Sequence, residues 1–250
     1  AKGVAGGLLA AGTAQSLNLT ENVTTDAALT NSTVNASANV SVIAQDTHNI
    51  SGTATGFSGA AFASGGLTKI DTKLTNTTKA QITASTVTAA DILLHAVTVI
   101  TKNTKATASS GALGGSANDV SDNTTVTNKT YAVAGTGSNL TADDTVTISA
   151  VTYNRYNGYA TAIAGAIVAK GVATAYEKIT DDVRVQIYPS VIKAGKGNVN
   201  IYAYAKDITE NLTAYGGAGG LAAGTNVKAE AVTDAAARVE FINGTAADHA

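Results

Sequence analysis

The sequence predicts an all-β fold, a parallel β-solenoid built from repeats of about 53 residues. Three observations predict it: two sequence markers recur at one period, apolar and polar residues alternate within them, and the composition favours strands and turns. The 250 residues include 38 Thr, 15 Ser and 25 Gly, but one proline and no Cys, Met or Trp. Abundant Thr and Val disfavour helices, and an unbroken strand ladder tolerates few prolines.

The first marker is an alternating apolar strand that occurs four times, at residues 40–44, 92–96, 146–150 and 199–203. Its copies are spaced by 52, 54 and 53 residues. The second marker occupies residues 79–82, 130–133, 184–187 and 238–241, spaced by 51, 54 and 54. Two markers with one period indicate a single solenoid segment over residues 1–250, with about four and a half repeats that start near residues 40, 92, 146 and 199.

Alternation with a period of two predicts strands, because successive side chains of a strand point to opposite faces. In the first copy of the first marker, we expect Val40, Val42 and Ala44 to point inward and Ser41 and Ile43 to point outward.

Three other stretches are interpreted separately. The alanines of Tyr159–Tyr176 are compatible with a helix, but Gly165, Gly171 and the match to the other repeats favour a strand. Ser109–Asp122 and Asn211–Ala223 are interpreted as loops or Gly-rich turns.

One 53-residue unit cannot bury its apolar face alone, so the repeats are expected to stack. With roughly twenty residues per coil, each repeat would supply two coils. About nine coils at a spacing of roughly 4.8 Å would then form a rod of roughly 40–45 Å.

Composition excludes several functional classes. A net charge of −2 with 14% charged residues provides no basic footprint for nucleic acid. Without cysteine there is no disulfide scaffold, thiolate metal site or cysteine nucleophile. The longest apolar stretches, such as Val4–Ala11 and Ala162–Ala169, are too short to cross a bilayer, so we expect no membrane insertion. No signal peptide follows Ala1, so we expect either a removed export signal or a segment of a longer chain.

No residue pattern predicts catalysis, a cofactor or a metal site. Nucleophile-elbow, zinc-helix and phosphate-loop motifs do not occur. The histidines His48, His95 and His249 have no carboxylate at a motif spacing, and we expect them on exposed or strand-face positions. A carbohydrate-active β-helix would need acidic clusters, and the acidic pairs here are 143–144 and 181–182. Arg184 and Arg238 fall at one repeat position, which predicts that they stack along a solvated face.

Asn-x-Ser/Thr sequons are about three times more numerous than chance predicts. They lie at Asn18, Asn22, Asn31, Asn35, Asn39, Asn49, Asn76, Asn123, Asn128, Asn139, Asn211 and Asn243. One interpretation is turn and strand chemistry, because Asn starts turns and Thr begins strands. The other is glycosylation of a secreted surface protein.

The order of segments in the repeat is a Gly/Ala run, an Asn- or Asp-rich turn, the second marker, a Ser/Asn-x-Val/Leu-x-Ala segment and then the first marker. It can be followed in residues 76–82 and 85–89, and again in 128–133, 139–142 and 146–150. This order resembles the repeats of giant secreted bacterial adhesins, in particular leukotoxin-type filamentous adhesins within the filamentous-haemagglutinin-like group. The resemblance covers nearly the whole chain, and it implies a right-handed β-helix stalk, secretion through an outer membrane and an extracellular or cell-surface location.

Two functions are expected from these observations. The first is a non-catalytic stalk or adhesive segment of a surface adhesin, whose partner would be a host or bacterial cell-surface receptor. The alternative is a subunit of an extracellular filament or sheath that associates with itself end to end or laterally, because unblunted solenoid ends present unpaired backbone groups. A carbohydrate-active β-helix is a third and weaker interpretation.

Overall fold

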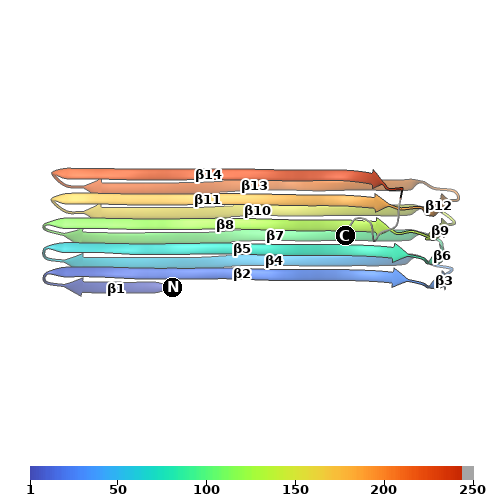
Figure 1. The fold of residues 1–250 in the computed structure, drawn as a ribbon, viewed down its shortest axis with the longest axis horizontal. Helices are drawn as coiled ribbons and strands as arrows, with labels where there is room; N and C mark the ends of the chain where they lie inside the picture. Colours follow the sequence, from blue (N-terminus) through green and yellow to red (C-terminus); the bar gives the residue numbers. More distant parts are fainter. Residues whose placement is uncertain (244–250) are drawn as a thin grey trace.

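A computed structural model describes residues 1–243, apart from the side chains of Ala10 and of residues 206–210. The described chain contains no helix and folds into three parallel sheets (Figure 1). Sheet A consists of β1 (Lys2–Gly7), β4 (Val40–Ala60), β7 (Ile92–Ala112), β10 (Val146–Gly165) and β13 (Val199–Gly219). Sheet B consists of β2 (Ala10–Thr30), β5 (Ala63–Thr83), β8 (Gly115–Ala134), β11 (Val168–Ile187) and β14 (Ala222–Phe241). Sheet C consists of the short strands β3 (Thr33–Asn35), β6 (Thr86–Ala89), β9 (Asn139–Ala142) and β12 (Val191–Ala194).

The fold is therefore the predicted parallel β-solenoid, but each repeat makes one coil rather than two. The first-marker segments begin β4, β7, β10 and β13, and Val40 pairs with Ile92, which in turn pairs with Val146. These partners are one whole repeat apart, so two coils per repeat is wrong. Sequence periodicity reports the repeat length, and it does not report how many times the chain turns within that length.

The coils are long and narrow. Strands of 20 or 21 residues in sheets A and B extend for about 66 Å at about 3.3 Å per residue. Coils stack at about 4.8 Å, so the first and fifth coils lie only about 19 Å apart. The molecule is therefore a flat blade with its long axis along the strands (Figure 1), and the predicted rod of stacked short coils is wrong.

The alternation of inward and outward side chains follows the prediction, but the two segments predicted as loops are mostly strand. Val40, Val42 and Ala44 are shielded, whereas Ser41 and Ile43 are exposed. Residues 159–176 belong to β10 and β11 and not to a helix. Residues 109–122 and 211–223, expected as loops, are mostly strand and are interrupted by two-residue turns. Their Gly, Ala and Ser have low strand propensity, but the ladder with neighbouring coils overrides that preference.

The corner between sheets B and C requires an unusual backbone conformation. Asn31, Ala84 and Gly137 lie at equivalent positions of successive coils, and all have positive φ, of 49°, 48° and 75°. Asn and Gly adopt this left-handed region more readily than other residues. The geometry of this corner is therefore a structural reason for asparagine at one sequon.

The core between sheets A and B is divided along the strands. One apolar cluster near the turns between these sheets contains small residues such as Ala106, Ala160 and Ala173. A central cluster contains Ile100 and Tyr156. The largest cluster lies toward sheet C, and its members include Ile82, Val87, Leu94, Leu140, Ile148 and Val185.

One coil per repeat predicts how the chain tolerates deletions. Removing residues 92–145 joins Asp91 to Val146 at equivalent positions, so we expect a shorter solenoid that unfolds cooperatively in urea with a reduced m-value, since m scales with the surface exposed. Removing only residues 92–118 joins the start of a sheet A strand to Asp119, near the start of a sheet B strand, so the coil loses its sheet A strand and this chain is expected not to fold. Circular dichroism and urea titration distinguish the two, and a folded second variant would contradict the assignment.

Candidate functional site

Two layers of buried polar side chains separate the three apolar clusters. We call them the ionic layer (Lys102, Thr104, Asp122 and Glu177) and the amide layer (Asn76, Asn128, Asn154, Asp181, Thr78, Thr98, Thr130 and Thr152). Every member has at most 2% of its surface exposed. Buried polar groups at this density need mutual partners, so the layers are the chemically distinctive part of the interior.

The ionic layer connects the two long sheets. Lys102 Nζ, from β7, lies 2.6 Å from Glu177 Oε1 of β11 and 3.7 Å from Asp122 Oδ1 of β8. Asp122 Oδ2 accepts hydrogen bonds from the Thr104 hydroxyl at 2.7 Å and from the Tyr159 backbone N–H at 3.1 Å. One cation thus lies between two carboxyl groups.

Burial and neighbouring charges set the pKa of Glu177 in the ionic layer, and a glycine leaves the space that the layer needs. Burial raises the pKa of Glu177, and Asp122 adds to that shift, while the ion pair with Lys102 opposes it. Gly158 leaves room for the cluster, since a Cβ there would lie 3.0 Å from Lys102 Nζ and 2.7 Å from a Leu212 methyl group. The layer is therefore enclosed by its own partners, which suits a structural role better than substrate binding.

The amide layer is a ladder that follows the stacking axis. Asn76 donates to Asn128 Oδ1 at 3.0 Å, and Asn128 donates to Asp181 Oδ1 at 3.1 Å. Asn154, on the opposite sheet, donates to Asp181 Oδ2 at 2.6 Å. Hydroxyl contacts of 2.8–3.0 Å link Thr78, Thr98, Thr130 and Thr152 beside it. Burial raises the pKa of Asp181 to about 6, against the two amide donors that favour its carboxylate form.

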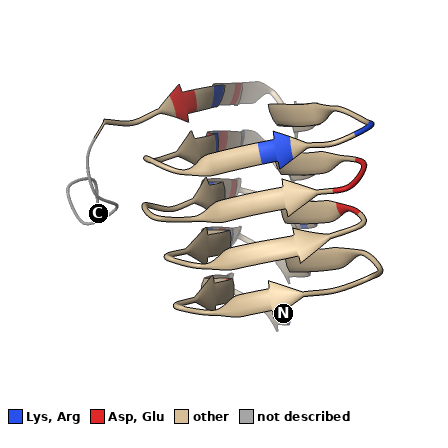
Figure 2. Ribbon diagram, turned by 90° about the vertical axis from the view of Figure 1, so that its right-hand side faces the viewer, with Lys and Arg blue, Asp and Glu red and all other residues tan. Residues whose placement is uncertain are grey.

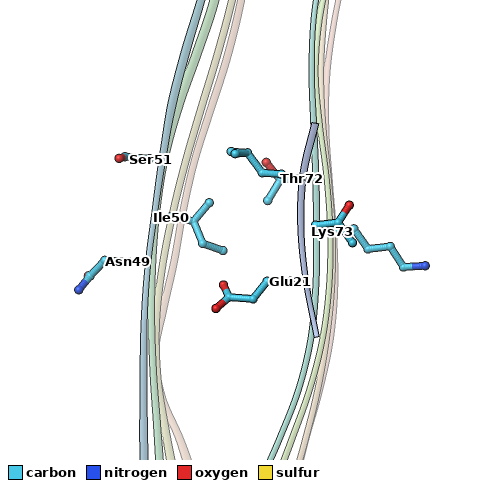
Figure 3. Close-up of a pocket in the computed structure, with 8 residues that line it drawn as sticks. Glu21, Asn49, Ile50, Ser51, Thr72 and Lys73 are labelled. Carbon is cyan, nitrogen blue, oxygen red and sulfur yellow. The ribbon is translucent and has the colours of Figure 1, made fainter. Parts of the chain in front are cut away.

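A pocket of about 280 Å³ lies between β2 of the first coil and β4 and β5 of the second. Figure 3 shows Glu21, Ile50 and Thr72 pointing into it, while Asn49 and Lys73 point outward. The pocket exists because β1 pairs only with Thr55–Ala60, so no described strand of the first coil faces this part of β2. It is unfilled core space between the long sheets.

Two histidines differ in their surroundings. His48 is buried beside the pocket, with Nε2 2.8 Å from Asp46 Oδ2 and Nδ1 3.3 Å from Glu21 Oε2. His48 is not exposed but lies on the inner face of its strand, where Asp46, two residues earlier on the same face, supplies the carboxylate partner. His95 lies on the outer face 2.8 Å from Ser149 Oγ, and burial lowers its pKa. His249 lies outside the described residues.

The outer face of sheet B carries a charged cluster. Arg184 pairs in register with Arg238, as predicted for stacked positions. Arg184 Nε lies 2.6 Å from Asp182 Oδ1, and Tyr131 donates to the other oxygen at 2.8 Å. Asp181 points into the core, so the 181–182 pair lies on opposite faces of one strand and cannot act together on a ligand. Within residues 1–243, no group of three or more His, Asp or Glu side chains is arranged to bind a metal ion.

The sequons divide into two classes by exposure. Nine asparagines are exposed: Asn18, Asn22, Asn31, Asn35, Asn39, Asn49, Asn139, Asn211 and Asn243. Asn123 is half-buried and donates to Asp71. Asn76 and Asn128 are fully buried members of the amide layer, so neither can carry a sugar in the folded protein.

Sequence interpretation missed both polar layers. A signal for Lys102 was present, because the inward alternation Ile92, Leu94, Ala96, Thr98 and Ile100 continues to Lys102. Its partner Glu177 lies 75 residues away. The contact becomes visible only when one repeat is treated as one coil.

Comparisons with protein families, with curated proteins and with solved structures find no match to this chain. No helix with the length and hydrophobicity of a membrane span occurs among residues 1–243.

Removing the cation of the ionic layer should be costly. We expect Lys102→Met to lower the free energy of unfolding by about 3–5 kcal/mol, because two carboxyl groups remain buried without a cation. Adding Glu177→Leu should recover a large part of that loss. Lys105→Met is the matched control: Lys105 points outward over the Tyr159 ring at 5.3 Å, and its loss should cost about 1 kcal/mol or less. Equal decreases in the free energy of unfolding for the two lysine variants, measured by urea unfolding, would show that the ionic layer stabilises the fold no more than an exposed lysine does.

Asp181 predicts a pH-dependent stability. A carboxyl group with a raised pKa favours the folded state when protonated, so its stabilising effect is present below about pH 4 and disappears as the pH rises through about 6. Asp181→Asn keeps the ladder neutral, and the Asn154 amide can rotate to accept from it. The stability advantage of this variant over wild type should grow to about 3 kcal/mol between pH 4 and 7.

The control for this pH dependence is Asp182→Asn on the outer face of the same strand. Burial alone would raise the pKa of Asp182, but hydrogen bonds from Arg184 and Tyr131 lower it. This variant should therefore be less stable than wild type at pH 7, and the deficit should shrink in acid. Parallel pH profiles for both variants would refute the assignment.

Proposed function

We propose that this chain is a non-catalytic structural segment of an extracellular bacterial surface adhesin, in which stacked coils extend a stalk or form its adhesive surface. The observation that carries the proposal is the in-register pairing of whole coils: in sheets A and B nearly every residue has a partner one repeat away. Such an architecture lengthens by adding coils without altering those already present. The resemblance of the repeat to filamentous adhesins supports the same conclusion.

Two further features support a passive role outside the cell. The buried polar groups of the ionic and amide layers contact each other rather than an open cleft. Nine sequons are exposed. Six of them lie between Asn18 and Asn49, where sugars would coat β2, β3 and the first half of β4. A cell-surface receptor is the partner that this function implies.

A filament subunit that stacks end to end is a second candidate, and one observation favours it. Through the chain of register partners, Ala229 and Ala231 of β14 occupy the positions that Leu17 and Leu19 have on β2. If β14 of one copy paired in register with β2 of another, these two alanines would therefore lie beside the two leucines, small side chains against large ones. Strand addition of this kind satisfies the open backbone groups of both edges.

The native polypeptide distinguishes these functions. An antibody raised against the folded chain should label intact cells of the native source, and protease treatment of intact cells should remove that label. For the adhesin segment we expect one covalent polypeptide far heavier than 24.8 kDa, seen as a single rod by negative-stain electron microscopy. Fibres that dissociate into chains of about this mass would replace the adhesin with the filament, and label only after permeabilisation would refute both. Excess mass in hexose-sized steps would identify the exposed sequons as glycosylated.

A further inference from the structure

The five turns that join sheet A to sheet B form one continuous edge of the blade (Figure 1). Each turn has two residues and contains at least one Leu, Ile or Phe. We call this edge the apolar ridge, and its turns are Leu8-Leu9, Ala61-Phe62, Leu113-Gly114, Ala166-Ile167 and Gly220-Leu221. Its bulky side chains are all exposed, up to 91% for Leu221. Scattered apolar residues are ordinary on a protein surface, but these residues form one continuous row along one edge, which makes the row a candidate interaction site.

Charge is nearly excluded from the ridge. Within four residues on either side of the five turns, Lys170 is the sole charged residue. The opposite end of the blade differs, because its turns contain Asp91, Asp143, Asp144 and Lys196 (Figure 2). The same coils therefore build one charged end and one apolar end.

The backbone of the ridge is also prepared for a dry environment. The inter-coil ladder continues through the turns, where the N–H groups of Leu113, Ile167 and Ala222 donate to the carbonyls of Ala61, Leu113 and Ile167 at 2.9–3.3 Å. Removing a paired N–H from water costs far less than removing an unpaired one. The turns of the charged end are paired in the same way, for example from the Asp144 N–H to the Ala90 carbonyl at 2.9 Å. The pairing therefore permits burial of the ridge, and the apolar side chains select it.

The dimensions of the ridge favour a lipid surface over a second copy of the chain. Five coils at about 4.8 Å and two sheets about 10 Å apart give an edge of roughly 240 Å². A stable protein interface needs roughly 800 Å² from each partner, and two convex ridges would bury less than their full edges. Side chains that project from a row of turns can instead enter a fluid apolar phase independently of its shape.

We propose that the apolar ridge inserts shallowly into the interfacial region of a lipid bilayer, with the blade standing on this edge and its charged end facing away. Because the five turns lie side by side in successive coils, their tips reach a similar depth. Lys170, three residues beyond Ile167, can extend its ammonium group to the headgroup level. This revises the expectation of no membrane insertion: Val4–Ala11 and Ala162–Ala169 are each too short to span, but the fold gathers them at one edge.

Single-tryptophan probes test the proposal, since the chain has no Trp of its own. Phe62→Trp places the probe on the ridge. Tyr204→Trp is a matched control on β13, similarly exposed (51% against 57%) but 15 residues from the end of its strand. With phosphatidylcholine vesicles, we expect the emission of the first probe to shift to shorter wavelength and to be quenched by brominated acyl chains, and the second to stay unchanged. Adding phosphatidylserine should change binding less than about twofold, because the ridge has no cationic cluster.

Replacing Leu8, Leu9, Leu113, Ile167 and Leu221 with Ser in the Phe62→Trp chain should weaken vesicle binding at least about tenfold, with an unchanged circular dichroism spectrum. If that chain does not fold, Leu113→Ser and Leu221→Ser singly should each weaken binding about threefold. Absence of vesicle binding, equal responses of the two probes, full binding by the Ser variants or binding that depends on phosphatidylserine would each overturn the proposal. A spectral shift without vesicles that grows with protein concentration would assign the ridge to a second copy of the chain instead.

Discussion

The in-register parallel ladder with a period of one whole repeat is the constraint on which the rest of the structure depends. Because partners lie 52 to 54 residues apart, each inward side chain lies above another inward side chain. The interior is thus organised in columns that run through successive coils, interrupted in sheet A where β1 ends and at a register shift between Tyr153 and Arg155 of β10. A residue such as Lys102 must be accommodated by Ile50 below and Tyr156 above as well as by the facing sheet.

Long strands create a difficulty that the polar layers resolve. Sliding a coil by two residues preserves the inward and outward alternation, and in a uniformly apolar core it would cost little. The same slip here would move Lys102 away from Glu177 and Asn128 away from Asp181, which would leave charged and amide groups against apolar side chains. The two layers therefore specify the register at two points along strands of about 66 Å.

Much of the architecture could be predicted from the sequence, because the period is carried by strand residues that alternate. The starts of four coils at Val40, Ile92, Val146 and Val199 follow directly from it. The second marker is displaced by one residue in its second copy, since Lys79 pairs with Tyr131 and not with Thr130. Such a slip is invisible without the ladder, because Thr and Tyr are both typical strand residues.

The remaining features depend on contacts between distant residues. Gly-, Ala- and Ser-rich stretches such as 109–122 look like loops locally, and only pairing with the coils above and below makes them strands. For the same reason, no local pattern distinguished the buried sequons Asn76 and Asn128 from exposed ones. The ionic layer combines residues from three strands, so it could not be predicted until the coil was defined.

The turns at the two ends of the blade differ in how far the backbone determines their residues. At the corner with sheet C, the backbone demands a left-handed residue, and Asn31 and Gly137 follow from that demand. At the opposite turns, Gly114 and Gly220 show that a side chain is dispensable at either turn position. A Leu side chain that is 91% exposed, as at residue 221, adds almost nothing to the core. Phe62 and Ile167, on inner coils, are 57% and 53% exposed, so they still pack partly against their neighbours. Folding therefore explains where the turns lie and part of the packing of their side chains, and the proposed contact with a bilayer would use the part that stays exposed.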